Sequence, residues 1–231
     1  MKSVNCTVQQ IEALTNTVHK VILLSDEAVE FKAGQYIQAV MGENDNRPFS
    51  IASTPAQLPM IELHIGADPA NGYAYEVLKK CEREGEIELQ IALGEAYLRP
   101  SPLPLVIVAG GTGYSYAKSL VYSCISQQPE RAIKLYWGAK SVSDLYELHQ
   151  LEALAQDNSM FTFIPVVEQK PAVWEHRTGL VHEAVLTDYD DLVGVQVYTA
   201  GRFEMAAVIR EVFSAKNLLA ENLIGDAYAF I

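Results

Sequence analysis

Short apolar runs broken by turn residues fill the first hundred positions of the chain, and they predict a β-rich domain. Glycine, proline and asparagine stand between the runs at the intervals typical of a small antiparallel barrel or sandwich. One longer segment, residues 73–84, has helical spacing instead. The strands are expected at residues 6–14, 18–24, 35–41, 49–53, 61–65 and 86–93.

The period of the apolar positions changes after residues 101–104, where two prolines remove amide donors and disfavour helix. We therefore predict two domains, residues 1–100 and residues 101–231. Apolar strands and helical segments alternate in the second domain, which predicts an α/β fold with five parallel strands and helices on both faces. The strands are expected at residues 105–109, 133–137, 161–167, 195–200 and 223–226, and the helices at 114–127, 144–156, 179–186 and 204–216.

Composition narrows the classes of partner. The content of 49% hydrophobic and 20% charged residues is ordinary for a globular protein, and the net charge of −12 argues against nucleic acid or an anionic membrane as partner. No run approaches the roughly 18 apolar residues of a membrane span, and the first residues lack the apolar core of a signal peptide, so we expect a cytoplasmic protein. Cys6, Cys81 and Cys124 are widely spaced, which predicts free thiols and no metal centre.

A glycine-rich turn follows the strand at residues 105–109, and a helix is expected directly after it. Backbone N–H groups in such a turn, together with the helix dipole, receive a nucleotide phosphate. The missing side chains let the backbone approach a pyrophosphate, and Thr112 and Ser115 add hydroxyl groups. The turn is neither G-x-G-x-x-G nor a Walker A loop, which disfavours ATP hydrolysis. A tight turn that binds nothing is the alternative interpretation.

A second cluster, Arg-Pro-Phe-Ser at residues 47–50, places a cation, a rigid ring, an aromatic and a hydroxyl in one strand. Arg47 and Phe49 share one face of that strand and Ser50 lies on the other, although Pro48 suggests that the alternation is interrupted. A planar ring could lie along this strand. In the alternative interpretation, Arg47 is a surface cation and Phe49 a core residue.

These motifs carry a resemblance. Residues 47–50 resemble the Arg-x-Tyr/Phe-Ser flavin motif of the ferredoxin–NADP reductase superfamily, and Gly-Gly-Thr-Gly at 110–113 matches its pyridine-nucleotide loop. Ala-Gly-Arg-Phe-Glu-Met at 200–205 resembles its later Cys-Gly-x-x-x-Met element, with alanine in place of cysteine. Further segments, at 62–67, 94–99 and 226–231, resemble the bacterial NAD(P)H:flavin oxidoreductases, so the resemblance covers essentially the whole chain.

The resemblance implies a six-stranded antiparallel flavin-binding β-barrel with Greek-key connections, followed by a nicotinamide-binding α/β domain. It places Ser50 near flavin N5 as the catalytic residue and implies no metal. The residues expected at the flavin are Tyr36, Arg47, Pro48, Phe49, Ser50, His64, Ile65 and Gly66. Those expected at NADH or NADPH are Gly110, Gly111, Thr112, Gly113, Tyr114, Ser115, Gly201, Arg202, Phe203 and Met205.

The sequence departs from the superfamily at the diphosphate site. Members that keep FAD permanently carry a basic residue after the strand at 61–65 and a Gly-x-x-Ser/Thr turn, whereas residues 66–75 contain no cation and Asp68 repels a phosphate. We therefore expect riboflavin, FMN or FAD to be an exchangeable substrate. No acidic residue follows directly after the strand at 133–137; Lys140 and Ser141 either accept a 2′-phosphate or are solvated, so both NADH and NADPH are expected.

The expected activity is NAD(P)H-dependent reduction of free flavin, with reduced flavin released to a luciferase, a two-component monooxygenase or ferric iron reduction. One alternative is a reductase with tightly bound FAD that passes electrons to a protein partner. An alternative of another class is a non-catalytic flavin or dinucleotide sensor. The four histidines outside residue 64 are assigned no role, Tyr228 is expected in the core, and the role of Phe230 is left open.

Overall fold

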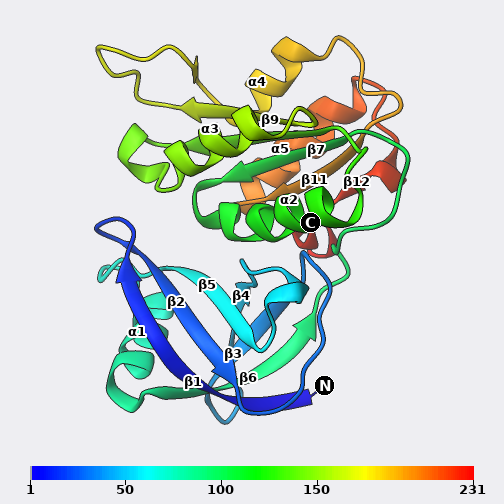
Figure 1. The fold of residues 1–231 in the computed structure, drawn as a ribbon. Helices are drawn as coiled ribbons and strands as arrows, with labels where there is room; N and C mark the ends of the chain where they lie inside the picture. The colour runs from blue at the N-terminus through cyan, green and yellow to red at the C-terminus, as the bar shows by residue number, and fades with distance from the viewer. Residues whose placement is uncertain (1) are drawn as a thin grey trace. The chain divides into compact units, whose positions relative to one another are not determined.

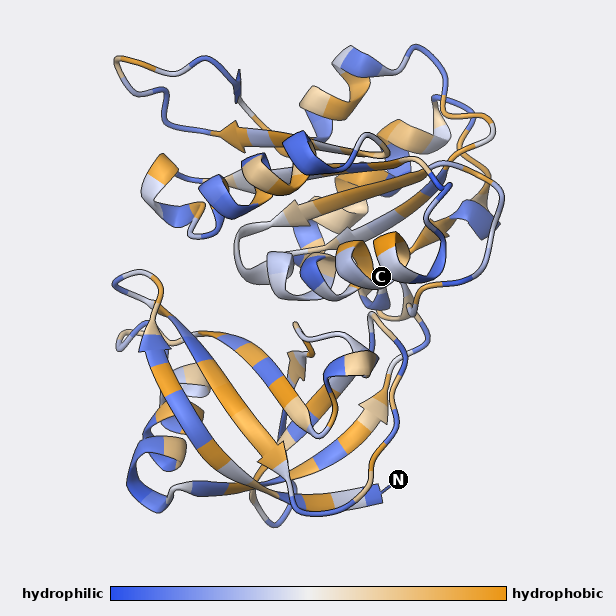
Figure 2. Cartoon of the chain, viewed as in Figure 1, coloured by the Kyte–Doolittle hydropathy of each residue, from blue (hydrophilic) through white to orange (hydrophobic). Residues whose placement is uncertain are grey.

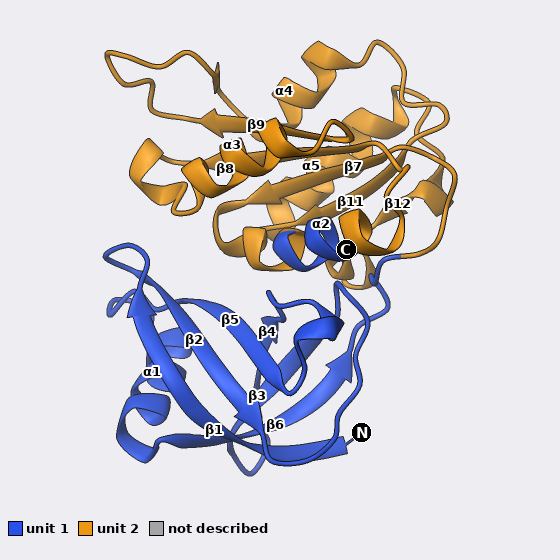
Figure 3. Ribbon diagram, viewed as in Figure 1, with its two compact units in different colours: residues 1–98, 118–123 blue, residues 99–117, 124–231 orange. Residues whose placement is uncertain are grey.

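The computed structural model describes residues 2–231 and divides into two compact units (Figures 1 and 3). The first unit extends to Leu98 and also includes Lys118–Ser123, from the middle of helix α2 (Tyr114–Gln127). The second unit comprises Arg99–Ala117 and Cys124–Ile231. No helix within residues 2–231 is both long and apolar enough to cross a membrane.

The first unit is an antiparallel sheet of six strands that closes on itself, as predicted. The strands are β1 (Lys2–Ala13), β2 (Val18–Ser25), β3 (Tyr36–Gly42), β4 (Asp45–Ser50), β5 (Met60–Gly66) and β6 (Glu86–Leu93), in the order β4-β3-β6-β1-β2-β5. A bridge between Ile51 and Leu63 joins the two edges, and the Ala52 amide donates to the Glu62 carbonyl (2.8 Å). Strand β6 returns by a long connection to pair with β1, as in a Greek key.

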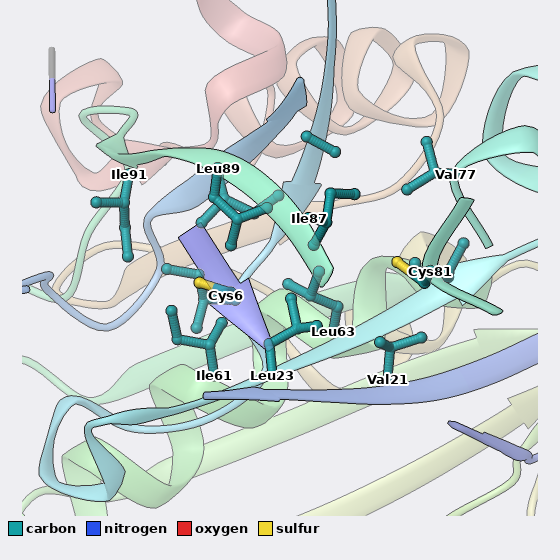
Figure 4. Close-up of a cluster of buried hydrophobic side chains, with 14 of the residues drawn as sticks. Cys6, Val21, Leu23, Ile61, Leu63, Val77, Cys81, Ile87, Leu89 and Ile91 are labelled. Carbon is teal, nitrogen blue, oxygen red and sulfur yellow. The ribbon is translucent and has the colours of Figure 1, made fainter. Parts of the chain in front are cut away.

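Alternation along the barrel strands gives the first unit an apolar core (Figure 2). In β5, for example, Ile61, Leu63 and Ile65 are all buried on the inner face. Helix α1 (Gly72–Glu84) covers part of this core. Figure 4 shows its members from four strands and α1: Cys6, Val21, Leu23, Ile61, Leu63, Val77, Cys81, Ile87, Leu89 and Ile91.

All three cysteines are buried free thiols, which confirms the prediction. Burial raises the pKa of the Cys6 thiol to about 12 and that of Cys81 to about 11. Burial also raises the pKa of Cys124. Because the thiolate is the reactive form, these side chains act as small apolar residues near neutral pH.

Strand β4 differs from the strand expected at residues 49–53, since it begins at Asp45 and ends at Ser50. The turn before it is tighter than predicted because Asn44 adopts a left-handed backbone (φ 63°). Pro48 is accommodated because β4 is an edge strand whose pairing partner is β3. The expected interruption at the proline was therefore wrong: the pairing of β4 with β3 is continuous from Ser50 to Asn46, with Arg47 buried and Pro48 exposed.

The second unit contains a parallel sheet of six strands, one more than the five predicted. They are β7 (Leu105–Gly110), β8 (Ile133–Ala139), β9 (Phe161–Val167), β10 (Arg177–Thr178), β11 (Gln196–Ala200) and β12 (Leu223–Ile224), in the order β10-β9-β8-β7-β11-β12. The unpredicted strand is β10, which has two exposed residues and therefore no apolar run to reveal it. Besides α2, the helices are α3 (Leu148–Asp157), α4 (Val181–Asp188) and α5 (Phe203–Ser214).

Two helices of this unit begin later than predicted, for local reasons. The Asp144 carboxylate accepts hydrogen bonds from the amide (3.0 Å) and hydroxyl (2.7 Å) of Ser141 and closes a separate 3₁₀ turn, so α3 begins at Leu148 instead of residue 144. Gly179 has a φ of 107°, outside the helical region, so α4 begins two residues after it.

Candidate functional site

Arg47, the first residue of the predicted flavin motif, is buried among hydrogen-bond partners. Its guanidinium donates to the Asp45 carboxylate from Nε (2.9 Å) and Nη2 (2.7 Å), and Nη2 lies 2.8 Å from Glu76 Oε2. The remaining nitrogen donates to the Tyr73 carbonyl. Hydrogen bonding to Asp45 raises the pKa of Arg47, burial opposes this, and Glu76 adds to the rise. Arg47 is thus no solvated surface cation; it ties β4 to the first turn of α1.

The hairpin of β3 and β4 brings Tyr36 and Ser50 directly opposite each other, with Pro48 two residues along the same face. Ser50 and Tyr36 are half-buried and Pro48 is exposed. Phe49 lies on the other face and packs against the barrel core. A planar ligand on this hairpin would therefore meet Tyr36, Pro48 and Ser50, while the Phe49 side chain supports the strand from below.

Strand β5 places a buried charged cluster next to the end of β4. One carboxylate oxygen of Glu62, Oε1, lies 2.7 Å from His64 Nε2 and 2.8 Å from Lys118 Nζ. Burial on its own would raise the pKa of Glu62, but hydrogen bonds from His64 and Lys118, with the charge of Lys118, lower it to about 2. Glu62 is therefore ionised at neutral pH.

The backbone around this cluster is tied to the segment after β4. The Glu62 amide donates to Ser53 Oγ (3.1 Å), and Ser119 Oγ donates to the Ser53 carbonyl (2.8 Å). Ile65 and Gly66, the other two residues predicted at this edge of the flavin, have no polar side chain to contact it. Ile65 is fully buried in the core, so its backbone alone is available, and Gly66 is half-buried at the end of β5.

In the second unit, the glycine loop is partly exposed to solvent. Gly111 and Thr112 are exposed, and Gly111 adopts a left-handed backbone (φ 54°). Tyr114 and Ser115 are buried, and Ser115 Oγ donates to the Thr112 carbonyl (3.1 Å). The side chains of Tyr114 and Ser115 thus support the loop from inside, and the hydroxyl expected at a phosphate from Ser115 is already engaged.

The glycine loop and the predicted Gly-x-x-x-Met element pack tightly together. A methyl group added at Gly113 would lie 2.4 Å from the Ala200 carbonyl oxygen, and one at Gly110 would lie 2.8 Å from Met205 Sδ. Gly201 has a φ of 154°, and a methyl group there would lie 2.5 Å from Met205 Cε. The sequence analysis explained these glycines by the approach of a ligand. The structure shows that Gly113 is also required by neighbouring backbone atoms, whereas Gly110 faces the flexible side chain of Met205.

The remaining predicted dinucleotide residues, Arg202 and Phe203, are exposed at the start of α5. The Phe203 ring contacts that of Phe230 edge-to-face, with centroids 6.2 Å apart, and both rings are more than half exposed. Tyr228 is half-buried, and its hydroxyl accepts a hydrogen bond from Thr199 Oγ (3.0 Å). An aromatic pair therefore stands at the predicted nicotinamide end of the site.

The turn after β8 offers less to a 2′-phosphate than the sequence suggested. Ser141 donates both its amide and its hydroxyl to Asp144, as described for the start of α3. Lys140 is exposed. The turn thus presents one cation beside one carboxylate, which gives no net attraction for a dianion.

Sequence reasoning missed four residues that support these sites. Glu62 shares a strand face with His64, which is a local signal of a polar pair in a buried strand. Lys118 meets Glu62 across 56 positions of sequence, so no local pattern could reveal it. Trp137 donates from Nε1 to the Gly111 carbonyl (2.9 Å), and Glu147 accepts from the Tyr114 hydroxyl (2.7 Å).

Comparison with protein families identifies a known domain in the second half of the chain. Residues 107–211 match the family model described as an oxidoreductase NAD-binding domain. The matched segment begins within β7 and includes the glycine loop, the turn after β8 and the Gly-x-x-x-Met element.

The chain is similar over nearly its whole length to two curated proteins. It is 46% identical over 235 residues to an NAD(P)H-flavin reductase of Aliivibrio fischeri, covering 99% of each chain, and 42% identical over 236 residues to an NAD(P)H-flavin reductase of Vibrio harveyi, covering 99% of this chain and 100% of the relative. Among solved structures, cytochrome P450 reductase GcoB of Amycolatopsis has a TM-score of 0.89 at 23% identity, covering 97% of this chain and 69% of that one. This last likeness shows the fold alone.

Proposed function

The chain belongs to the NAD(P)H-flavin reductase family, and from that membership we propose that it oxidises NADH or NADPH and reduces free flavin by direct hydride transfer from nicotinamide C4 to flavin N5. The observation that carries the proposal is the 46% identity over 99% of both chains, because it includes the barrel as well as the NAD-binding unit. The proposed reaction needs no metal.

For hydride transfer the protein needs mainly to position the nicotinamide and flavin rings, because the dinucleotide supplies the hydride and the flavin accepts it. The face formed by Tyr36, Pro48 and Ser50 fits a planar ring, and the Ser50 hydroxyl donates a hydrogen bond at N5. The exposed amides of Gly111 and Thr112, at the start of a helix, fit an anionic diphosphate. These assignments give each unit one of the two ligands.

The charges of the barrel favour a flavin that enters and leaves. Arg47 is the cation of the proposed flavin segment, and its donors are engaged by Asp45, Glu76 and Tyr73. Two carboxylates around one guanidinium leave a net negative charge, and Asp68 is exposed between β5 and α1. A flavin phosphate gains little here, so the ring and the ribityl chain carry recognition. Protein that purifies with stoichiometric FAD would contradict this proposal.

The test of the activity is loss of NADH and NADPH absorbance with purified protein, with and without added riboflavin, FMN and FAD. We expect oxidation that depends strictly on added flavin. Oxidation without added flavin would instead indicate a tightly bound FAD that serves a protein partner. Binding of both ligands without turnover would indicate a sensor.

Replacing the Ser50 hydroxyl tests its proposed role at N5. Ser50→Ala is expected to lower kcat about tenfold and to change the KM for NADH less than twofold, because the lost hydrogen bond acts on the reacting atom. Ser3→Ala, at an exposed serine of the same barrel, is the control and should leave both constants unchanged. An unchanged kcat in Ser50→Ala would remove Ser50 from the mechanism.

The reduced flavin is proposed to leave the protein and serve another enzyme. The proposed acceptor of the reduced flavin is a luciferase or a two-component monooxygenase, or the flavin passes its electrons to ferric iron. The two relatives from luminous bacteria favour the luciferase. A cytoplasmic location is part of the proposal, because NADH and NADPH are supplied there.

A further inference from the structure

A buried aromatic stack lies against the glycine loop of the second unit. Trp137, near the end of β8, is fully buried, and its ring stacks on that of Tyr114 with centroids 4.0 Å apart and planes at 15°. The indole N–H donates to the Gly111 carbonyl (2.9 Å). Gly111, which is exposed and left-handed, is thus joined to a buried aromatic stack.

Two neighbours hold the stack in place. The Tyr146 ring meets both stacked rings edge-on, at 5.7 Å from Tyr114 and 5.0 Å from Trp137. The Tyr114 hydroxyl donates to Glu147 Oε2 (2.7 Å). Because the rings are packed on several sides and a hydrogen bond to the buried carboxyl group of Glu147 fixes the phenol, the direction of the indole N–H is well determined.

The bond to Gly111 also orients the amide that follows it. In a trans peptide the C=O of one residue and the N–H of the next point in opposite directions. With the Gly111 carbonyl directed at the buried indole, the Thr112 N–H is directed away from it, on the exposed side of the loop. This amide stands in the short 3₁₀ turn Gly111–Gly113, which leads directly into α2, and backbone N–H groups at such a start have no intrahelical acceptor.

Gly111 is also the residue at which this peptide could most easily rotate. A glycine populates both signs of φ at similar energy, and a methyl group added at Gly111 would meet no atom within 4 Å. A rotated peptide would present the carbonyl oxygen, in place of the Thr112 N–H, to an approaching diphosphate. The Gly111 carbonyl accepts hydrogen bonds from the Trp137 indole and from the Tyr114 amide, and both disfavour that rotation.

Resting on the proposed function, we propose that Trp137 is a positioning residue for the dinucleotide: it holds the Gly111 peptide so that the Thr112 N–H faces the diphosphate. Trp137 itself touches no ligand in this proposal. Its contribution concerns the affinity for NADH and NADPH and leaves the flavin site untouched.

Trp137→Phe tests the proposal, because phenylalanine keeps an aromatic ring in the stack and lacks the N–H donor. We expect the KM for NADH and for NADPH to rise about tenfold, while kcat and the KM for riboflavin change less than twofold. Denaturation curves of the variant and the parent show whether folding is preserved.

The chain offers a matched control in its other tryptophan. Trp174 also donates its indole N–H to a backbone carbonyl, that of Arg177 (2.8 Å), in a loop outside the glycine turn. Trp174→Phe is expected to change none of the kinetic constants. If Trp137→Phe leaves the KM for NADH unchanged, or changes it no more than Trp174→Phe does, the positioning role is overturned.

Fluorescence gives a second measurement that does not depend on turnover or on the stability of Trp137→Phe. In Trp174→Phe, Trp137 is the single tryptophan, and titration with NAD⁺ is expected to change its emission. Binding of NAD⁺ without any such change would overturn the proposal. A change in emission in a protein that does not oxidise NADH with added flavin would refute the proposed function and leave the role of Trp137 standing.

Discussion

Gly113→Ala is expected to lower kcat/KM for NADH about a hundredfold. The backbone of Gly113 is right-handed helical (φ −57°, ψ −14°), so alanine adopts it without strain and the effect is steric. The new methyl carbon would lie 2.4 Å from the Ala200 carbonyl oxygen and 2.6 Å from its carbon. Both are backbone atoms, so the end of β11 must move, and the element that begins at Gly201 moves with it.

A graded series of alanine variants separates this steric cause from a general effect of removing glycine. At Gly110 the added methyl meets the thioether of Met205, a flexible side chain, so Gly110→Ala is expected to lower kcat/KM about tenfold. At Gly42, the last residue of β3, it meets nothing within 4 Å, and Gly42→Ala should be indistinguishable from the parent. Steady-state kinetics measure the series; equal effects at Gly113 and Gly42 would contradict the explanation.

The barrel was predictable because its interior imposes a period of two on every strand that lines it. In β5 that period makes Ile61, Leu63 and Ile65 apolar, while the pair Glu62 and His64 shares the outer face. The parallel strands of the second unit were predictable for another reason, since strands buried on both faces read as continuous apolar runs. Two exposed residues such as those of β10 give neither signal.

The candidate site was predictable where its chemistry lies within one segment. The glycine loop and the Arg-Pro-Phe-Ser cluster are local, so their residue types could be read directly. Their partners are not local: Glu76 reaches Arg47 from another element, and Trp137 reaches Gly111 from the neighbouring strand. The burial of Tyr114 and Ser115 depends on such packing between distant segments. For this reason the Ser115 hydroxyl, which was expected to contact a phosphate, instead donates to the Thr112 carbonyl within the loop.

Glu62→Gln is expected to lower the free energy of unfolding at pH 7 by about 3 kcal/mol. The amide keeps the shape of the side chain and removes the charge that both His64 and Lys118 face in a buried cluster. Breaking a buried ion pair on one side typically costs about 3–5 kcal/mol, because the opposite charge is then less well compensated. Urea denaturation at pH 7 measures the difference, and Glu88→Gln, at an exposed glutamate of β6, is the control.

The pH dependence distinguishes loss of this charge from a simple packing defect. The pKa of Glu62 is lowered from 4.5 to about 2 in the folded protein, where burial is outweighed by the hydrogen bonds of His64 and Lys118 and the charge of Lys118. A lowered folded-state pKa stabilises the protein above the unfolded value of 4.5, and this stabilisation, about 3 kcal/mol, is lost as pH falls through about 2. The difference between the parent and Glu62→Gln should therefore shrink as pH falls from 5 toward 2. A difference that stays constant over that range would show that the carboxylate charge contributes nothing to stability.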